Sequence, residues 1–127
     1  MRVVFTIAQW LVRITGVLQL ILGLLIWTEG AASLIGIHML IGLLLVIGLL
    51  VLAGVAVPLG GPVGFAATVA VLSIVMLVFG MTQASILPGP NHWIVQVVHL
   101  LLGMAVVGMA EGLGGRVRRA QTAGSAA

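Results

Sequence analysis

Four long apolar runs take up most of this 127-residue sequence and limit what it can fold into. A helix needs about 20 apolar residues to cross the hydrocarbon core of a bilayer, and each run has roughly that length. Only 6% of the residues are charged, against about 25% in soluble domains. The chain therefore has too few charged side chains to form a polar surface in contact with water. We expect an all-α integral membrane protein, an up-down four-helix bundle, with spans at about residues 5–27, 34–57, 63–81 and 93–113.

The breaks between these runs carry turn-forming residues. A short polar link occupies residues 28–33, Pro-Leu-Gly-Gly-Pro occupies 58–62, and Leu-Pro-Gly-Pro-Asn occupies 87–91. Proline ends a helix because its ring removes a backbone N–H and clashes with the preceding turn. The sequence therefore predicts one four-helix domain over residues 1–113, followed by a flexible basic cytoplasmic tail over residues 114–127.

The distribution of charge predicts the orientation of the chain. All the basic residues are arginines near the two ends of the sequence: Arg2, Arg13, Arg116, Arg118 and Arg119. Basic residues mark the cytoplasmic side of a membrane protein, and an even number of spans brings both termini to one side. We expect a multi-pass protein of the cell inner (plasma) membrane with its N- and C-termini in the cytoplasm.

The composition excludes several chemistries. The chain has no cysteine, which rules out disulfides, thiolate metal sites and covalent c-type haem attachment. It has no aspartate and no plausible Ser-His-acid set, so hydrolytic catalysis is not expected. No soluble domain is present to carry a basic face, so we expect no nucleic-acid partner.

One short pattern occurs twice. His38-x3-Gly42 opens the second apolar run, and His99-x3-Gly103 lies near the start of the fourth. In the expected topology both runs point from outside to inside, which places both histidines roughly 6–9 Å below the outer interface. The repeat has two alternative explanations: duplication of a helical hairpin, or chance similarity within a leucine-rich sequence. In either case, imidazoles at equal depth on two parallel helices can face one another across the bundle core.

An imidazole within the bilayer is unfavourable, and by default it indicates a functional site. The leading interpretation is one haem b, with His38 and His99 binding its iron from opposite sides. Gly42 and Gly103 would leave room for the flat macrocycle. Further polar residues share the inward stripes of the third and fourth helices near the outer end. The expected cofactor-binding residues are His38, His99, Gly42, Gly103, His92, Gln96 and Gln83.

Two other interpretations of the histidines stay open. Each could hydrogen-bond to a neighbouring helix, with the glycines serving close helix packing. Alternatively, the pair could form a metal or proton site. Arg13 and Glu111 have a simpler interpretation: they lie at similar depth, with Arg13 roughly 21 Å below the outer interface, so we expect a structural ion pair.

Two families share motifs with this chain. Arg13-x2-Gly16-x6-Gly23 in the first run resembles the opening of DoxX-like four-span proteins, some of which are linked to quinone oxidation. The placement of His38 and His99 is similar to one half of a haem A synthase, or to a b-type cytochrome bundle. In those proteins, histidines on the second and fourth helices bind haem, so the resemblance implies the same role here.

Three functions therefore compete. The first is a haem-b-binding protein that passes electrons to or from a quinone or redox partner, which we favour over a stand-alone enzyme. The second is a non-catalytic accessory subunit of a larger membrane complex, or a homo-oligomer. The third is a small transporter or proton path that uses Arg13, Glu111, Gln19 and the histidines.

Overall fold

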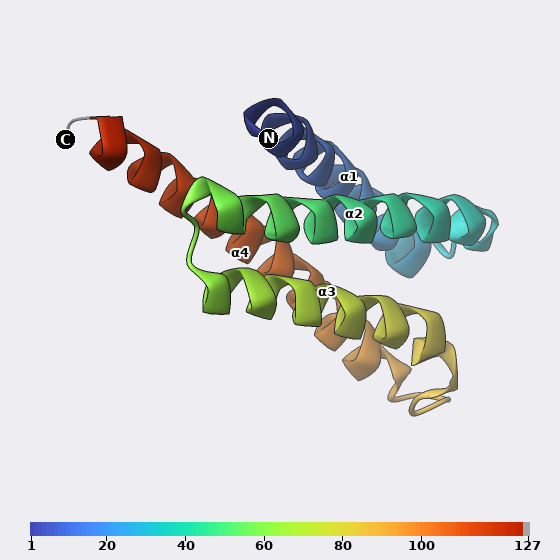
Figure 1. Ribbon diagram of the computed structural model, residues 1–127. Coiled ribbons are helices and arrows are strands. Elements are labelled where there is room, and N and C mark those ends of the chain that lie inside the picture. The colour runs from blue at the N-terminus through green and yellow to red at the C-terminus, as the bar shows by residue number, and fades with distance from the viewer. Residues whose placement is uncertain (126–127) are drawn as a thin grey trace.

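The computed structural model describes residues 1–125, and this part of the chain contains four long helices and no strand. Consecutive helices run in opposite directions and are joined by short turns at alternate ends (Figure 1). The prediction of an all-helical chain is confirmed, and all four helices are long and apolar enough to cross a membrane. The helices are α1 (Arg2–Glu29), α2 (Ile35–Ala56), α3 (Val63–Thr82) and α4 (His92–Ser125).

Three short 3₁₀ turns follow the ends of the first three helices: η1 (Ala32–Leu34), η2 (Val57–Leu59) and η3 (Gln83–Ser85). Glycine ends α1 at Gly30, with φ 63°, and ends η2 at Gly60, with φ 88°. Both φ values lie in the left-handed region, which glycine adopts without the Cβ clash that other residues suffer. Pro58 lies at the start of η2, and Pro62 directly precedes α3. The turn residues therefore stop the helices where the sequence predicts.

Helix α4 continues past Leu113, where the sequence places the start of a tail, and runs through Ser125. The extension packs against the turn between α2 and α3. Val117 on this extension is buried, and the Ala120 methyl lies 3.1 Å from where a Cβ would stand at Gly60. This burial explains the extra helical turns, because packing of an apolar face stabilises helix more than local propensity does. Residues 126–127 of the expected tail lie outside the described part of the chain.

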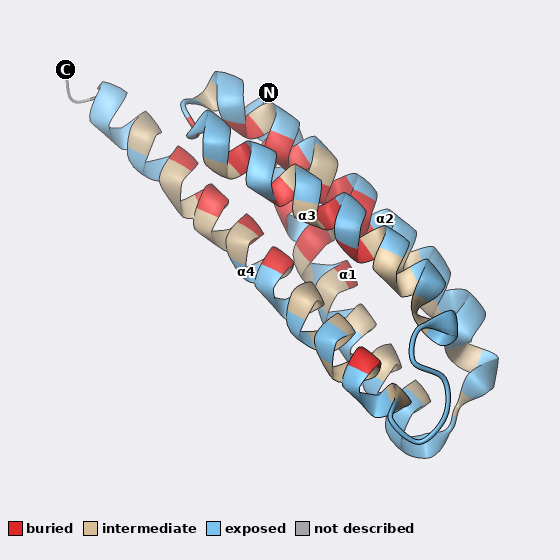
Figure 2. Cartoon of the chain, turned by 90° about the horizontal axis from the view of Figure 1, so that it is seen from below, coloured by how far each residue is buried: buried red, intermediate tan, exposed pale blue. Residues whose placement is uncertain are grey.

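The fully buried side chains gather in one half of the bundle. We call residues 1–15, 45–76 and 106–125 the terminal half, because it contains both chain ends. Residues 16–44 and 77–105 form the distal half. Figure 2 shows the buried positions concentrated toward the N- and C-terminal ends, and in the distal half only Val95 is fully buried. The terminal half thus buries nearly all of the core, whereas the distal half keeps most of its side chains partly exposed.

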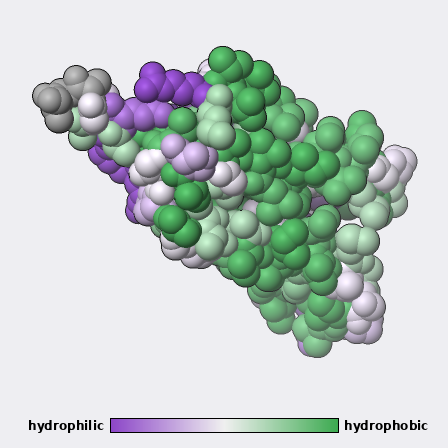
Figure 3. All heavy atoms as spheres, viewed as in Figure 1, coloured by the Kyte–Doolittle hydropathy of each residue, from purple (hydrophilic) through white to green (hydrophobic). Residues whose placement is uncertain are grey.

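The outer surface of the bundle is strongly apolar. Large aliphatic side chains stand exposed on every helix, among them Ile14, Leu40, Val78 and Leu101. Figure 3 shows hydrophobic residues over most of the visible face, with hydrophilic residues gathered at the end where α4 terminates. This distribution differs from that of a soluble helix, which keeps charged and polar residues on its outer face.

Candidate functional site

Two histidines meet in the middle of the distal half. His38 on α2 and His99 on α4 have ring centroids 6.4 Å apart, with the ring planes inclined by 57°. Both side chains are half-buried. Their helices are not neighbours in the chain, so the antiparallel arrangement of all four helices is what brings these rings together. No group of three or more His, Cys, Asp or Glu residues that could hold a metal ion occurs in the described chain, so the donor set here is two imidazoles.

Each imidazole lies against a glycine of a neighbouring helix. A Cβ at Gly23 of α1 would stand 3.4 Å from His38 Cε1, and one at Gly80 of α3 would stand only 2.9 Å from His99 Cε1. Phe79 adds a stacked ring on His99, with centroids 6.0 Å apart and an angle of 24°. The missing side chains of α1 and α3 therefore give both rings space to reach the bundle interior.

The glycines within the His-x3-Gly motifs face side chains. A Cβ at Gly42 would stand 2.6 Å from Gln19 Nε2, so the amide of Gln19 occupies the space beside this glycine. A Cβ at Gly103 would stand 3.7 Å from Met76 Sδ. The room expected for a macrocycle next to Gly42 and Gly103 is thus taken by two unbranched, flexible side chains.

Four buried polar atoms of the described chain lack a hydrogen-bond partner, and all belong to the distal half. One comes from α1, one from α2, one from η3 directly after α3, and one from α4, so every side of the bundle contributes. They are Gln19 Oε1, His38 Nδ1, Gln83 Oε1 and His99 Nδ1. We refer to these four residues as the distal polar cluster. An unpaired buried group of this kind costs about 1–3 kcal/mol, and it indicates a site for water, an ion or a ligand.

The other expected residues lie toward the end of the distal half. His92 Nδ1 lies 3.2 Å from the carbonyl oxygen of Ile86, so this ring is held by the loop that precedes α4. Gln96 is half-buried one turn before His99. In the same loop, Leu87 has a φ of 50°, a left-handed conformation that is uncommon for a residue with a side chain. Gln83 therefore shares with the two histidines a buried polar atom without a partner, whereas His92 contacts the loop before α4.

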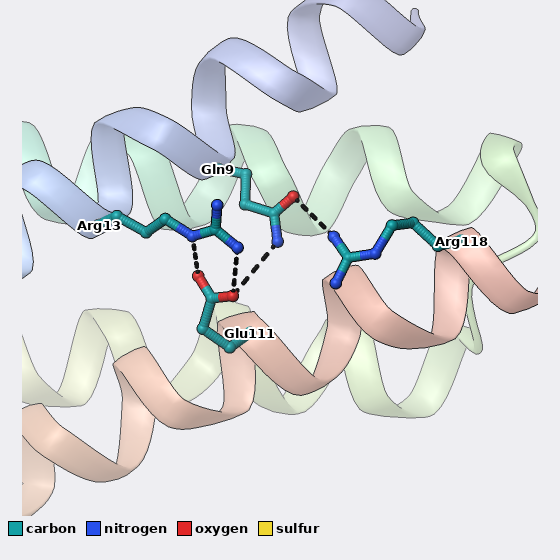
Figure 4. Close-up of polar contacts among 4 residues, drawn as sticks. All are labelled: Gln9, Arg13, Glu111 and Arg118. Atoms are coloured by element: carbon teal, nitrogen blue, oxygen red, sulfur yellow. Dashed lines mark hydrogen bonds and ion pairs between the residues drawn. The ribbon is translucent and has the colours of Figure 1, made fainter.

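A second polar group lies in the terminal half and joins the first helix to the last. Arg13 Nε donates to Glu111 Oε1 at 2.8 Å, and Arg13 Nη2 donates to Glu111 Oε2 at 2.7 Å. Gln9 Nε2 also donates to Glu111 Oε2, at 3.4 Å, and Arg118 Nη1 donates to Gln9 Oε1 at 3.2 Å. Figure 4 shows these four side chains reaching across the gap between α1 and α4. The structure thus joins the pair expected from depth and adds Gln9 and Arg118.

Four residues of these two groups were not predicted from the sequence, and Gln19 was predicted only for a transport path. The four are Gly23, Gly80, Gln9 and Arg118. A signal for Gln9 was present, because it precedes Arg13 by four residues and so shares a helix face with it. Helical spacing also places Gly80 on one face with Gln83, and Gly23 on one face with Gly16, but it does not reveal that these glycines lie against the histidines of a neighbouring helix.

The chain matches no known protein family, no curated protein and no solved structure. The resemblance to DoxX-like proteins and to haem A synthases therefore rests on the Arg-Gly and His-Gly motifs of the sequence.

Proposed function

We propose that this chain is an integral membrane protein whose four helices cross the bilayer, with both termini on the cytoplasmic side. The exposed aliphatic surface supports this proposal. Contact of such a surface with water carries a large free-energy penalty, whereas contact with lipid tails does not. All five arginines lie in the terminal half, so this half would face the cytoplasm. The distal half, with the histidines, would then lie in the outer leaflet.

We further propose that the distal half binds one haem b, held by His38 and His99. The observation that carries this proposal is the 6.4 Å between the two ring centroids. Two metal–nitrogen bonds of about 2 Å, plus about 1 Å from each nitrogen to its ring centre, add to roughly 6 Å. The two imidazoles thus lie close enough that both could bind one metal ion, such as the iron of a haem.

Two features of the surroundings support a ligand at this point. The distal half buries only one residue, Val95, so it contributes little apolar core of its own. The distal polar cluster also leaves His38 Nδ1 and His99 Nδ1 without partners in that interior. Gln19 and Met76, which lie against the motif glycines, are flexible enough to move aside for a planar group.

The chain's own residues would hold and orient such a group. His38 and His99 would serve as ligands, while Gly23 and Gly80 let their rings approach the centre. Gln83 would offer an amide toward the outer edge of the site, in place of the basic residues that the distal half lacks. Haem supplies one-electron transfer when bound, and we propose exchange with a quinone or a redox partner. The His-x3-Gly motifs of α2 and α4 then have equivalent roles, which is what duplication of a helical hairpin would produce.

A second candidate is a purely structural role for the histidines. It is favoured by the close fit of His99 against Gly80 and of Gln19 against Gly42. In this case the chain would be an accessory subunit or a homo-oligomer without a cofactor, and the glycines would serve helix packing.

Absorbance spectra distinguish the two candidates. The protein is purified in mild detergent, supplemented with haem, and measured before and after reduction with dithionite. We expect a Soret band and sharp reduced bands in the native protein and in His92→Ala, and their loss in His38→Ala and His99→Ala. Helix content measured by circular dichroism serves to exclude misfolding. A native protein that takes up no haem, or unchanged spectra in both ligand variants, would contradict haem binding and favour the structural role.

A further inference from the structure

A pocket of about 330 Å³ lies between α1 and α4 at the terminal end of the bundle. Its polar lining includes Arg2 and Gln9 from α1 and Arg118 and Gln121 from α4. Phe5 and Val117 contribute apolar surface to the same pocket. Because charged, polar and apolar groups meet here, the pocket suits a ligand that is itself partly charged and partly apolar.

Neither arginine of this pocket forms a direct ion pair with a carboxylate within residues 1–125. The chain holds five arginines and two glutamates, and one of these, Glu29, lies at the opposite end. The other, Glu111, forms with Arg13 the one ion pair within residues 1–125. Arg118 instead donates a hydrogen bond to the neutral amide of Gln9, which directs its guanidinium toward α1 (Figure 4). The pocket therefore holds two cationic side chains near a single carboxylate, Glu111, which already pairs with Arg13, so its net charge is positive.

Guanidinium groups pair with phosphate through two parallel N–H···O bonds, which makes arginine the preferred residue for planar recognition of such anions. A pocket of this size is at the small end of the range for ligand sites, so it suits a headgroup and not a whole lipid. We propose that Arg2 and Arg118 bind the phosphate of an anionic phospholipid headgroup, with the first acyl carbons against Leu59, a half-buried residue that also lines the pocket. This inference depends on the proposed membrane insertion and is independent of haem.

Lipid competition measured by native mass spectrometry tests the proposal. The full-length protein is exchanged from detergent into an equimolar mixture of phosphatidylglycerol and phosphatidylcholine, and the retained lipids are counted. We expect the native protein to prefer phosphatidylglycerol, and Arg2→Gln and Arg118→Gln each to reduce that preference about fivefold. Arg119→Gln is the matched control, because it removes the same charge next to Arg118 from a residue that does not line the pocket. It should change the preference less than twofold.

Several outcomes would overturn the proposal. An equal loss in Arg119→Gln would show a general effect of surface charge instead of a site, and so would an absence of preference in the native protein. A second arm adds inorganic phosphate to detergent-solubilised protein, with chloride at matched ionic strength. If phosphate raises the Tm of the native protein but not of Arg118→Gln, while no lipid preference exists, the ligand is free phosphate and not a headgroup.

Two further measurements distinguish a loss of lipid binding from a loss of folding. Arg118→Lys retains the charge but loses the paired N–H donors, so its lipid preference should fall between those of the native protein and Arg118→Gln. A folding defect at this position would instead affect both variants equally. The haem spectrum of Arg118→Gln should equal that of the native protein. Failure of haem binding with an intact lipid preference would therefore contradict the proposed function alone.

Discussion

The imidazole rings of His38 and His99 lie 6.4 Å apart, in a half of the bundle where Val95 is the one fully buried residue. Polar rings usually reach a protein interior when hydrogen bonds compensate their burial, yet Nδ1 of both rings lacks a partner. The ring positions depend on glycines of α1 and α3. The properties of the site can therefore be tested through the residues that place the rings.

Gly80→Ala tests the contact that positions His99. The new methyl group would stand 2.9 Å from Cε1 of the ring, so the imidazole must shift away from α3. Because displacement of a supporting contact lowers metal affinity by about tenfold or more, we expect haem affinity to fall by about that factor in a spectroscopic titration. Gly64→Ala is the control on the same helix, since no atom lies within 4 Å of its Cβ position. Equal affinities of the two variants would contradict a positioning role for Gly80.

Gln83→Met tests whether the distal polar cluster is strained in the ligand-free protein. The substitution keeps the length of the side chain and removes the buried oxygen that lacks a partner. We expect the free energy of unfolding to rise by about 1 kcal/mol, measured by thermal unfolding in detergent without haem. Gln96→Met serves as the comparison, because Gln96 has no atom among those buried without a partner. A lower Tm for Gln83→Met would mean that its oxygen already has a partner, such as a bound water.

The Arg13–Glu111 pair should stabilise the closure of α1 against α4. Both side chains are about one-third exposed, so we expect a modest contribution of about 1 kcal/mol. Arg13→Gln and Glu111→Gln should each lower the Tm by a few degrees, and the double variant should lose no more than either single one. Glu29→Gln, at the opposite end of α1, should leave the Tm unchanged. Additive losses in the double variant would show that the two residues act independently.

Cysteine labelling tests the membrane topology. The native chain has no cysteine, so single substitutions in exposed segments report their own location without background. In intact cells, a membrane-impermeant maleimide should label Ser33→Cys between α1 and α2, and should not label Ala123→Cys near the end of α4. Both should react once the cells are broken. Labelling of Ala123→Cys in intact cells would contradict cytoplasmic termini.

Much of the fold could be predicted from the sequence because the signals were local. The third span was expected at about residues 63–81, and α3 occupies Val63–Thr82, since prolines and glycines on either side stop the helix. The end of α4 was not predictable in the same way. Val117 is buried only because the turn between α2 and α3 lies against it, and this contact depends on tertiary structure.

In the candidate site, too, features that depend on local sequence could be predicted, and features that depend on tertiary contacts could not. The meeting of His38 and His99 could be predicted, because the rise per residue places them at similar heights on two helices, and their ring centroids do lie 6.4 Å apart. The side chains facing Gly42 and Gly103 could not, because spacing along one helix does not reveal which residue of a neighbour lies opposite. Gln19 and Met76 fill those positions, although the sequence suggested open space there.

The uneven packing of the two halves has a consequence for the order of assembly. The terminal half contains nearly all of the close-packed core, so the four helices can associate there while their distal ends separate slightly. If the protein binds haem as proposed, the group could then be loaded at the distal end after insertion, without disturbing the contacts that hold the fold. Biogenesis of this protein would not require the group to be present during synthesis.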